Sequence, residues 1–317
     1  MPSDRGRAGC TCEVRSSAIS AQAGFAAAHP QRNGLSGEGV TVAVLDTGLD
    51  ASHPQMAGAI AGGGTDLVDG DGNPSEVVDG IDDNNNGVAD EAYGHGTFVA
   101  GLVRSVAPDA AILPVRILDS DGSTTSWTIA RGLAHARALG ADVINLSLGG
   151  HQLGPIVERQ IRALTDADIV VVAAAGNDAS TEARYPAAYS DVLSVGAIDG
   201  ATGAAATFSN HGSWIDVVAP GVDLVSTYPG SGYARWGGTS ASAPVVAGTV
   251  ALVRQAMPTA DSTDVVDKIT SSARSAGLSN ASSYGAVDIA AATERALAAA
   301  GSNPNGGSSS DADADGD

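Results

Sequence analysis

The chain has 317 residues, of which 43% are hydrophobic and 4% aromatic, and its 16 basic and 36 acidic side chains give a formal net charge of −20. Such a charge repels nucleic-acid backbones and anionic membrane surfaces, and no apolar run approaches the roughly 20 residues of a spanning helix. We therefore expect a soluble globular protein that binds neither nucleic acid nor membranes. A solvated, aspartate-rich surface is the simplest interpretation of the acidity, and cation binding is the alternative.

The two ends of the chain differ in composition from the rest. Residues 1–14 and 301–317 are polar and rich in small side chains. They predict a flexible N-terminal arm and a disordered acidic tail around one domain of residues 15–300. Cys10 and Cys12 in the arm are interpreted as incidental. The start lacks the basic and apolar regions of a secretory signal, which indicates a cytoplasmic protein as written, or an extracellular one if this is a mature or truncated form.

Short apolar runs alternate with longer segments of helical period. The predicted strands are Val40–Leu45, Ile112–Ile117, Asp142–Ser147, Ile169–Ala174, Val192–Ala197 and Ile215–Ala219. The predicted helices are His95–Val106, Trp127–Leu139, Pro155–Asp166, Ser240–Ala256, Ser262–Arg274 and Val287–Ala300. Continuous apolar runs are typical of strands buried on both faces. The alternation predicts an α/β fold, a single doubly wound domain with a mostly parallel central sheet.

Three short segments combine glycine with a chemically reactive side chain. In Val-Ala-Val-Leu-Asp-Thr-Gly, Asp46 directly follows an apolar run that is predicted to be a buried strand. In Gly-His-Gly-Thr, His95 begins a predicted helix. Ser240, within Gly-Gly-Thr-Ser-Ala-Ser-Ala-Pro, begins a very apolar helix, where free backbone N–H groups stabilise an oxyanion. Each segment alone has an ordinary structural explanation, namely a turn aspartate, a core histidine and a helix N-cap serine.

In the order Asp, His, Ser, these segments resemble the signatures of the subtilisin-like serine peptidases. Ala-Ala-Ala-Gly-Asn, which ends at Asn177, resembles a fourth signature, and the resemblance runs from about Gly37 to Ala300. It implies a serine endopeptidase with Ser240 as nucleophile, His95 as general base and acid, and Asp46 as the carboxylate that orients the imidazole. It also implies an oxyanion hole made by the Asn177 side chain and the Ser240 backbone N–H.

The resemblance extends to the segments that bind substrate. An extended peptide would pair its backbone between two of them, Gly122, Ser123 and Thr124 on one side and Ser147, Leu148 and Gly149 on the other. In this family the residue before a Tyr-Pro pair lies at the floor of the pocket for the side chain that precedes the scissile bond. That residue is Arg184, and a cationic floor favours Glu, Asp or a long side chain that covers it. Asp178 or Glu182 could instead neutralise the arginine.

The long loop Thr65–Glu91 is rich in Asp, Asn and Gly and has no Lys or Arg. Many family members have a tight calcium site, but the residues expected for it are missing from this sequence, so we expect that site to be absent. Within the loop, alternate oxygen donors match the start of a calcium-binding turn, and the candidate ligands are Asp82, Asn84, Asn86 and Asp90. The carboxylates of Asp66, Asp69 and Asp71 are candidates to complete the site, and Asp199 is a weaker cation candidate. The alternative is a solvated acidic loop; the absence of a Glu at the twelfth position excludes an EF-hand.

Other functions fit the sequence less well. A non-catalytic subtilisin-like binding or scaffold protein is the competing class. An esterase of the nucleophile-elbow type is disfavoured because no Gly-x-Ser-x-Gly follows a strand. The expected partners are polypeptide substrates, with a proteinaceous inhibitor or pro-segment as a further candidate, and we expect a monomer.

Overall fold

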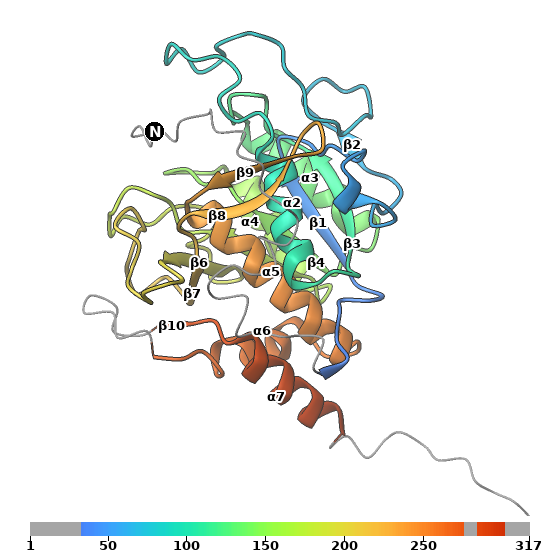
Figure 1. The fold of residues 1–317 in the computed structure, drawn as a ribbon, viewed down its shortest axis with the longest axis vertical. Helices are drawn as coiled ribbons and strands as arrows, with labels where there is room; N and C mark the ends of the chain where they lie inside the picture. The colour runs from blue at the N-terminus through green and yellow to red at the C-terminus, as the bar shows by residue number, and fades with distance from the viewer. Residues whose placement is uncertain (1–32, 276–283, 302–317) are drawn as a thin grey trace, which may run out of the picture.

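The fold is built on an eight-stranded sheet in the order β10-β7-β6-β5-β4-β1-β3-β2 (Figure 1). The computed structural model describes residues 33–275 and 284–301. The predicted N-terminal arm, with Cys10 and Cys12, and the predicted tail beyond Gly301 lie outside these residues. Every paired neighbour in the sheet is parallel, which confirms the predicted fold class.

The elements follow one another as strand and helix through most of the chain. The strands of the large sheet are β1 (Thr41–Asp46), β2 (Thr65–Asp66), β3 (Ala111–Arg116), β4 (Val143–Leu146), β5 (Val170–Ala174), β6 (Leu193–Ile198), β7 (Val217–Pro220) and β10 (Gly285–Ala286). The helices are η2 (Pro54–Met56), α2 (His95–Val106), α3 (Ser126–Ala138), α4 (Pro155–Thr165), α5 (Thr239–Ala256), α6 (Ser262–Thr270) and α7 (Ile289–Gly301). A separate antiparallel hairpin is formed by β8 (Leu224–Tyr228) and β9 (Gly232–Trp236).

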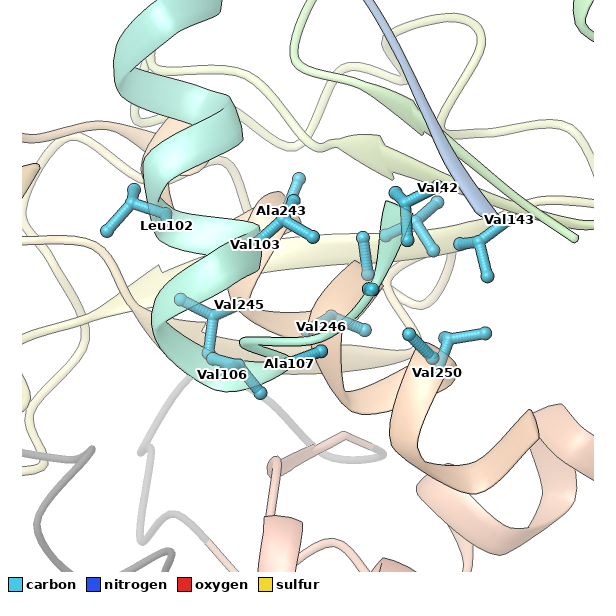
Figure 2. Close-up of a cluster of buried hydrophobic side chains, with 14 of the residues drawn as sticks. Val42, Leu102, Val103, Val106, Ala107, Val143, Ala243, Val245, Val246 and Val250 are labelled. Carbon is cyan, nitrogen blue, oxygen red and sulfur yellow. The ribbon is translucent and has the colours of Figure 1, made fainter. Parts of the chain in front are cut away.

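Both faces of the sheet are buried. In β1, Val42 and Val44 belong to the core shared with α2, α5, α6 and α7, whereas Ala43 and Leu45 belong to the core shared with α3 and α4. Figure 2 shows the first core, in which side chains of α2 and α5 meet Val42 and Val143. This arrangement confirms that the apolar runs are strands covered on both sides.

The strand order reverses direction between β1 and β4. The strands β3 and β2 continue the sheet on one side of β1, and β4, β5 and β6 continue it on the other. In open α/β sheets the crevice beyond the carboxyl ends of the strands at such a switch point is the usual place for a ligand. The residues that follow β1 and β4 therefore lie where a functional site is expected.

All predicted strands and helices are present, with small shifts in their bounds. The largest difference is at the end of α6, which stops at Thr270 because Arg274 pairs through its backbone with Ala286 of β10. The hairpin β8–β9 was not predicted from the sequence. None of the helices in the described ranges has the length and apolar character needed to cross a membrane.

Candidate active site

Asp46, the last residue of β1, is 1% exposed. Its Oδ1 accepts a hydrogen bond from the Thr47 N–H at 2.8 Å and lies 2.7 Å from Nδ1 of His95. The other oxygen, Oδ2, is buried and has no hydrogen-bond partner in the described part of the chain. A buried carboxylate held in this way orients the neighbouring ring and favours its charged form.

His95 is the first residue of α2 and follows Gly94, whose φ of 86° is left-handed. The start of this helix packs directly on the turn after β1, because a Cβ at Gly96 would lie 2.1 Å from the carbonyl oxygen of Gly48. On its other side the imidazole stacks on Trp236 of β9, with ring centroids 6.3 Å apart. The ring is therefore fixed between a carboxylate and an indole.

Opposing effects act on the pKa of His95. Burial lowers this pKa, but the Asp46 carboxylate, through its charge and its hydrogen bond, and the charge of Glu76 raise it above the ordinary histidine value. Since Nδ1 faces Asp46, the neutral ring carries its proton there and leaves Nε2 as the acceptor. Such a ring can take a proton from a hydroxyl group.

Ser240 is the second residue of α5, after the N-cap Gly238 and Thr239. The N-cap position is occupied by Gly238 and no side chain caps this helix, so the interpretation of Ser240 as a simple N-cap is wrong. Ser240 is instead bound to the segment after β4. Its hydroxyl donates to the Ser147 carbonyl at 3.1 Å, and the Ser147 hydroxyl donates to the Ser240 carbonyl at 2.9 Å. Among the described residues no hydrogen bond joins Ser240 to His95.

Asn177 follows β5 and is bound to the start of α5. Its Oδ1 accepts from the backbone N–H of Thr239 at 2.8 Å and from the Thr239 hydroxyl at 3.0 Å. Because a backbone N–H can only donate, this contact identifies the oxygen end of the amide, and Nδ2 is the donor end, which has no hydrogen-bond partner among the described residues. A Cβ at Gly238 would lie 3.3 Å from that Nδ2. The Asn177 donor therefore lies beside the segment that carries Ser240.

The predicted substrate segments differ in structure. Ser147 contacts Ser240, and Gly150, just beyond Gly149, pairs in antiparallel fashion with Tyr185. Gly122 has a φ of 76° and closes a turn by donating to the Asp119 carbonyl. Ser123 and Thr124 continue without regular strand structure into α3, and Leu148 is likewise outside β4.

Arg184 lies close to the backbone at Gly176 and at Gly149. An added Cβ would lie 3.1 Å from its side chain at Gly176 and 3.9 Å from it at Gly149. The Arg184 side chain is 12% exposed, and its guanidinium pairs with Asp178 at 2.7 Å. Glu182 instead contacts His151 at 3.7 Å. Of the two carboxylates considered from the sequence, Asp178 is the one that neutralises Arg184.

Part of the predicted calcium loop gathers around one carboxylate. Asn84 and Asn86 both donate through their side-chain amides to Glu91, and the Asn86 backbone N–H donates to Oδ1 of Asp82. Asp90 lies apart from them, because both of its oxygens accept the backbone N–H groups of Asp79 and Gly80. Within the described residues, no three His, Cys, Asp or Glu side chains are grouped as a metal site.

The second carboxylate cluster does not complete this loop. Asp66 and Asp69 both bind NH1 of Arg116, at 2.6 and 2.5 Å, and Arg116 and Asp66 are each 1% exposed. The sequence interpretation of Asp66 and Asp69 as cation ligands is therefore corrected, since both are already bound to a buried guanidinium, whose single charge balances one of them.

One residue of the site was missed in the sequence. Glu76 accepts hydrogen bonds from the Thr47 hydroxyl and from the backbone N–H groups of Gly94 and Thr97. The available signal was indirect: a helix that begins after Gly94 has no side chain of its own to cap it.

Known proteins share this chain's sequence and fold. A model of the subtilase family of peptidases matches residues 37–294, within the predicted domain. Subtilisin BL of Lederbergia lenta is 39% identical over 276 residues, which cover 84% of this chain and 94% of that protein. Thermitase of Thermoactinomyces vulgaris is 39% identical over 227 residues, covering 68% of this chain and 75% of that protein.

A solved structure of a protease from Pseudoalteromonas arctica superposes with a TM-score of 0.76 at 32% identity, covering 87% of this chain and 95% of that one. The similarity in sequence and in fold thus indicates the same class of enzyme as the contact between Asp46 and His95. The chain belongs to the subtilase family and is a subtilisin-like serine endopeptidase.

Proposed function

We propose that this endopeptidase cleaves extended polypeptide through the triad Asp46, His95 and Ser240 and an acyl-enzyme intermediate. The observation that carries the proposal is the 2.7 Å contact between Nδ1 of His95 and Oδ1 of Asp46. It leaves Nε2 free to accept a proton, and it stabilises the imidazolium that forms when that proton arrives.

The first chemical step needs a rotation of the Ser240 side chain away from the Ser147 carbonyl. His95 then takes the hydroxyl proton as Oγ bonds to the substrate carbonyl carbon, and it gives the proton to the amine as the C–N bond breaks. Water then attacks the resulting ester and loses a proton to His95. His95 gives that proton to Oγ as the bond between Oγ and the acyl carbon breaks, which releases the acid product and restores Ser240. Nδ2 of Asn177 and the Ser240 backbone N–H donate to the oxyanion in both steps.

A fluorophosphonate probe tests the nucleophile directly. The wild-type protein should be labelled and should hydrolyse casein, whereas Ser240→Ala should do neither, because the probe reacts only with an activated serine. Equal labelling of the two proteins, or no labelling of either together with no casein hydrolysis, would contradict the triad. That second outcome favours the non-catalytic binding or scaffold protein.

Asn177→Asp isolates the oxyanion donor. The aspartate keeps an oxygen for the Thr239 contacts, but it cannot donate through a side-chain N–H and it adds a negative charge beside the oxyanion, so kcat should fall by at least about 10²- to 10³-fold with little change in KM. This magnitude is the one known for a subtilisin that loses such a donor. Steady-state kinetics on a peptide substrate measure it, and an unchanged kcat would remove Asn177 from the mechanism.

We also propose that Arg184 forms the floor of the pocket for the side chain that precedes the scissile bond, between the segments of Ser147 to Gly149 and Gly176. Its pairing with Asp178 reduces the positive charge that a substrate meets. The expected wild-type preference for Glu or Asp is therefore weak, and long side chains that cover the ion pair are accepted. A proteinaceous inhibitor or pro-segment is a further proposed partner of the same cleft.

Replacing Asp178 should leave the positive charge of Arg184 unpaired and available to the substrate side chain. Asp178→Asn should raise cleavage after Glu and Asp about fivefold relative to other residues, a change set by one partly exposed ion pair. Profiling on a peptide library measures this. Glu182→Gln is the matched control, because Glu182 contacts His151 rather than Arg184 and its profile should match the wild type. A wild-type preference for Lys or Arg would contradict the pocket.

We further propose a structural calcium ion in the acidic loop, held by Asp82, Asn84, Asn86 and Glu91 rather than Asp90. The donor set fits, because Asp82 and Glu91 supply carboxylates, and the side-chain oxygens of Asn84 and Asn86, which accept the backbone N–H groups of Asn86 and Val88, each keep a second lone pair for a cation. Hard oxygen ligands of this kind suit Ca²⁺. The ion would stabilise the loop and takes no part in the chemical step.

Chelation tests this site through stability. In the inactive Ser240→Ala protein, EDTA at moderate salt should lower the melting temperature by about 5 °C, and excess CaCl₂ should restore it, as for a ligand that binds only the folded state. Asp82→Ala should remove the EDTA effect, while Asp71→Asn in the same loop should keep it. A melting temperature that EDTA leaves unchanged would exclude the calcium site.

A further inference from the structure

The helix that carries His95 begins without a cap of its own. Its N-cap is Gly94, and its first turn contains no acidic side chain. The free N–H groups of a helix start need partners, particularly when they are buried. Here Gly94 and Thr97 donate to the two oxygens of Glu76, at 3.0 and 2.9 Å. A residue far back in the acidic loop therefore serves as the cap of α2.

Two threonine hydroxyls complete the shell around Glu76. Thr47 accepts from the Gly96 N–H at 2.9 Å and donates to Oε2 at 3.0 Å. Thr97 accepts from the Asp50 N–H at 2.9 Å and donates to Oε1 at 2.9 Å. Each hydroxyl has its proton directed at Glu76, so four donors meet the carboxyl group. Burial and the charge of Asp46 raise the pKa of Glu76, and the donated hydrogen bonds oppose this by favouring the ionised form, which is an acceptor only.

The backbone of the loop lies against the turn that follows Asp46. Leu49 N–H donates to the Pro74 carbonyl at 2.8 Å, and a Cβ at Gly48 would lie 2.7 Å from the Ser75 backbone. Glu76 is thus joined on one side to the Asp46 turn through Thr47 and on the other to the first turn of α2. It bridges the two elements whose approach forms the Asp46–His95 pair.

The charge of Glu76 also acts on His95. The imidazolium formed in catalysis lies at the positive end of the α2 dipole, which disfavours it. The charged groups that face it are Asp46 from β1 and Glu76 from the loop, while Trp236 of β9 is neutral. Burial and the charge of Glu76 raise the pKa of Tyr93 and of Tyr228, so these neighbours stay neutral near pH 7.

We propose that Glu76 is a positioning residue for catalysis: it caps α2 from outside the helix, holds the Asp46 turn against it, and supplies a second negative charge that favours the His95 imidazolium. It contacts neither substrate nor the Ser240 hydroxyl in this role. The inference rests on the proposed triad, but its effect on His95 is measurable without turnover.

Glu76→Gln keeps the shape of the side chain and removes its charge. In the full chain, the glutamine NH2 replaces an oxygen that accepts two hydrogen bonds, so kcat on a peptide substrate should fall about tenfold or more, with KM little changed. Without the second carboxylate the imidazolium is less favoured, so the pKa of His95 falls. The acid limb of kcat/KM should therefore move to lower pH. Glu76→Asp should restore the wild-type limb, and the exposed Glu294→Gln on α7 should match the wild type throughout.

An NMR titration separates this inference from the proposed function. The imidazole signal of His95 is followed against pH in Ser240→Ala protein, with and without Glu76→Gln, and it is assigned by its loss in His95→Gln. A lower pKa in the Glu76→Gln protein supports the inference even if the wild type is inactive, and an equal pKa overturns it. If Glu76→Gln does not fold, Thr47→Val removes one of the four donors. A folded Thr47→Val protein with lowered kcat supports the inference, and one with wild-type kcat overturns it.

Discussion

The first turn of α2 lies directly on the turn after β1, and the site depends on this close approach. At Gly96 a single added carbon would lie 2.1 Å from the Gly48 carbonyl oxygen, so no side chain fits between the two segments. The approach brings His95 to Asp46 at 2.7 Å. Because a helix start and a strand end both carry unpaired backbone groups, the contact also needs polar partners, which Thr47 and Glu76 provide.

The second half of the site is assembled from other strands. Ser147 follows β4, Asn177 follows β5, and both bind the start of α5. Parallel strands end at one edge, so the sheet brings these short segments together without further structure. The two halves join where Trp236 stacks on His95, shortly before the glycines that lead into α5. The Ser240 hydroxyl bonds to the Ser147 carbonyl in the second half, and in the mechanism proposed above it turns toward His95.

Most of the fold could be predicted from the sequence because its signals are local. The apolar face and glycine start of α2 determine its bounds, His95–Val106, which the structure reproduces. The hairpin strand β9, Gly-Tyr-Ala-Arg-Trp, was missed because it is only partly buried and lacks a strict apolar alternation. The roles of Arg116 and Glu76 could not be predicted, since each depends on partners that are distant in the sequence and carry no local pattern.

The acidic side chains of the chain also lie in different environments, which composition alone cannot predict. Within the loop of residues 65–91, Asp66 is neutralised by a buried arginine, and Glu76 is held by four donors at a helix start. Asp83 is different, because burial and the charges of Asp119, Asp79, Asp121 and Asp82 all raise its pKa. A cation would relieve such repulsion, as the calcium proposal above requires, whereas Glu76 is compensated by its four donors. One loop thus combines a charge fixed by the fold, which acts on His95, with carboxylates whose mutual repulsion helps to raise the pKa of Asp83.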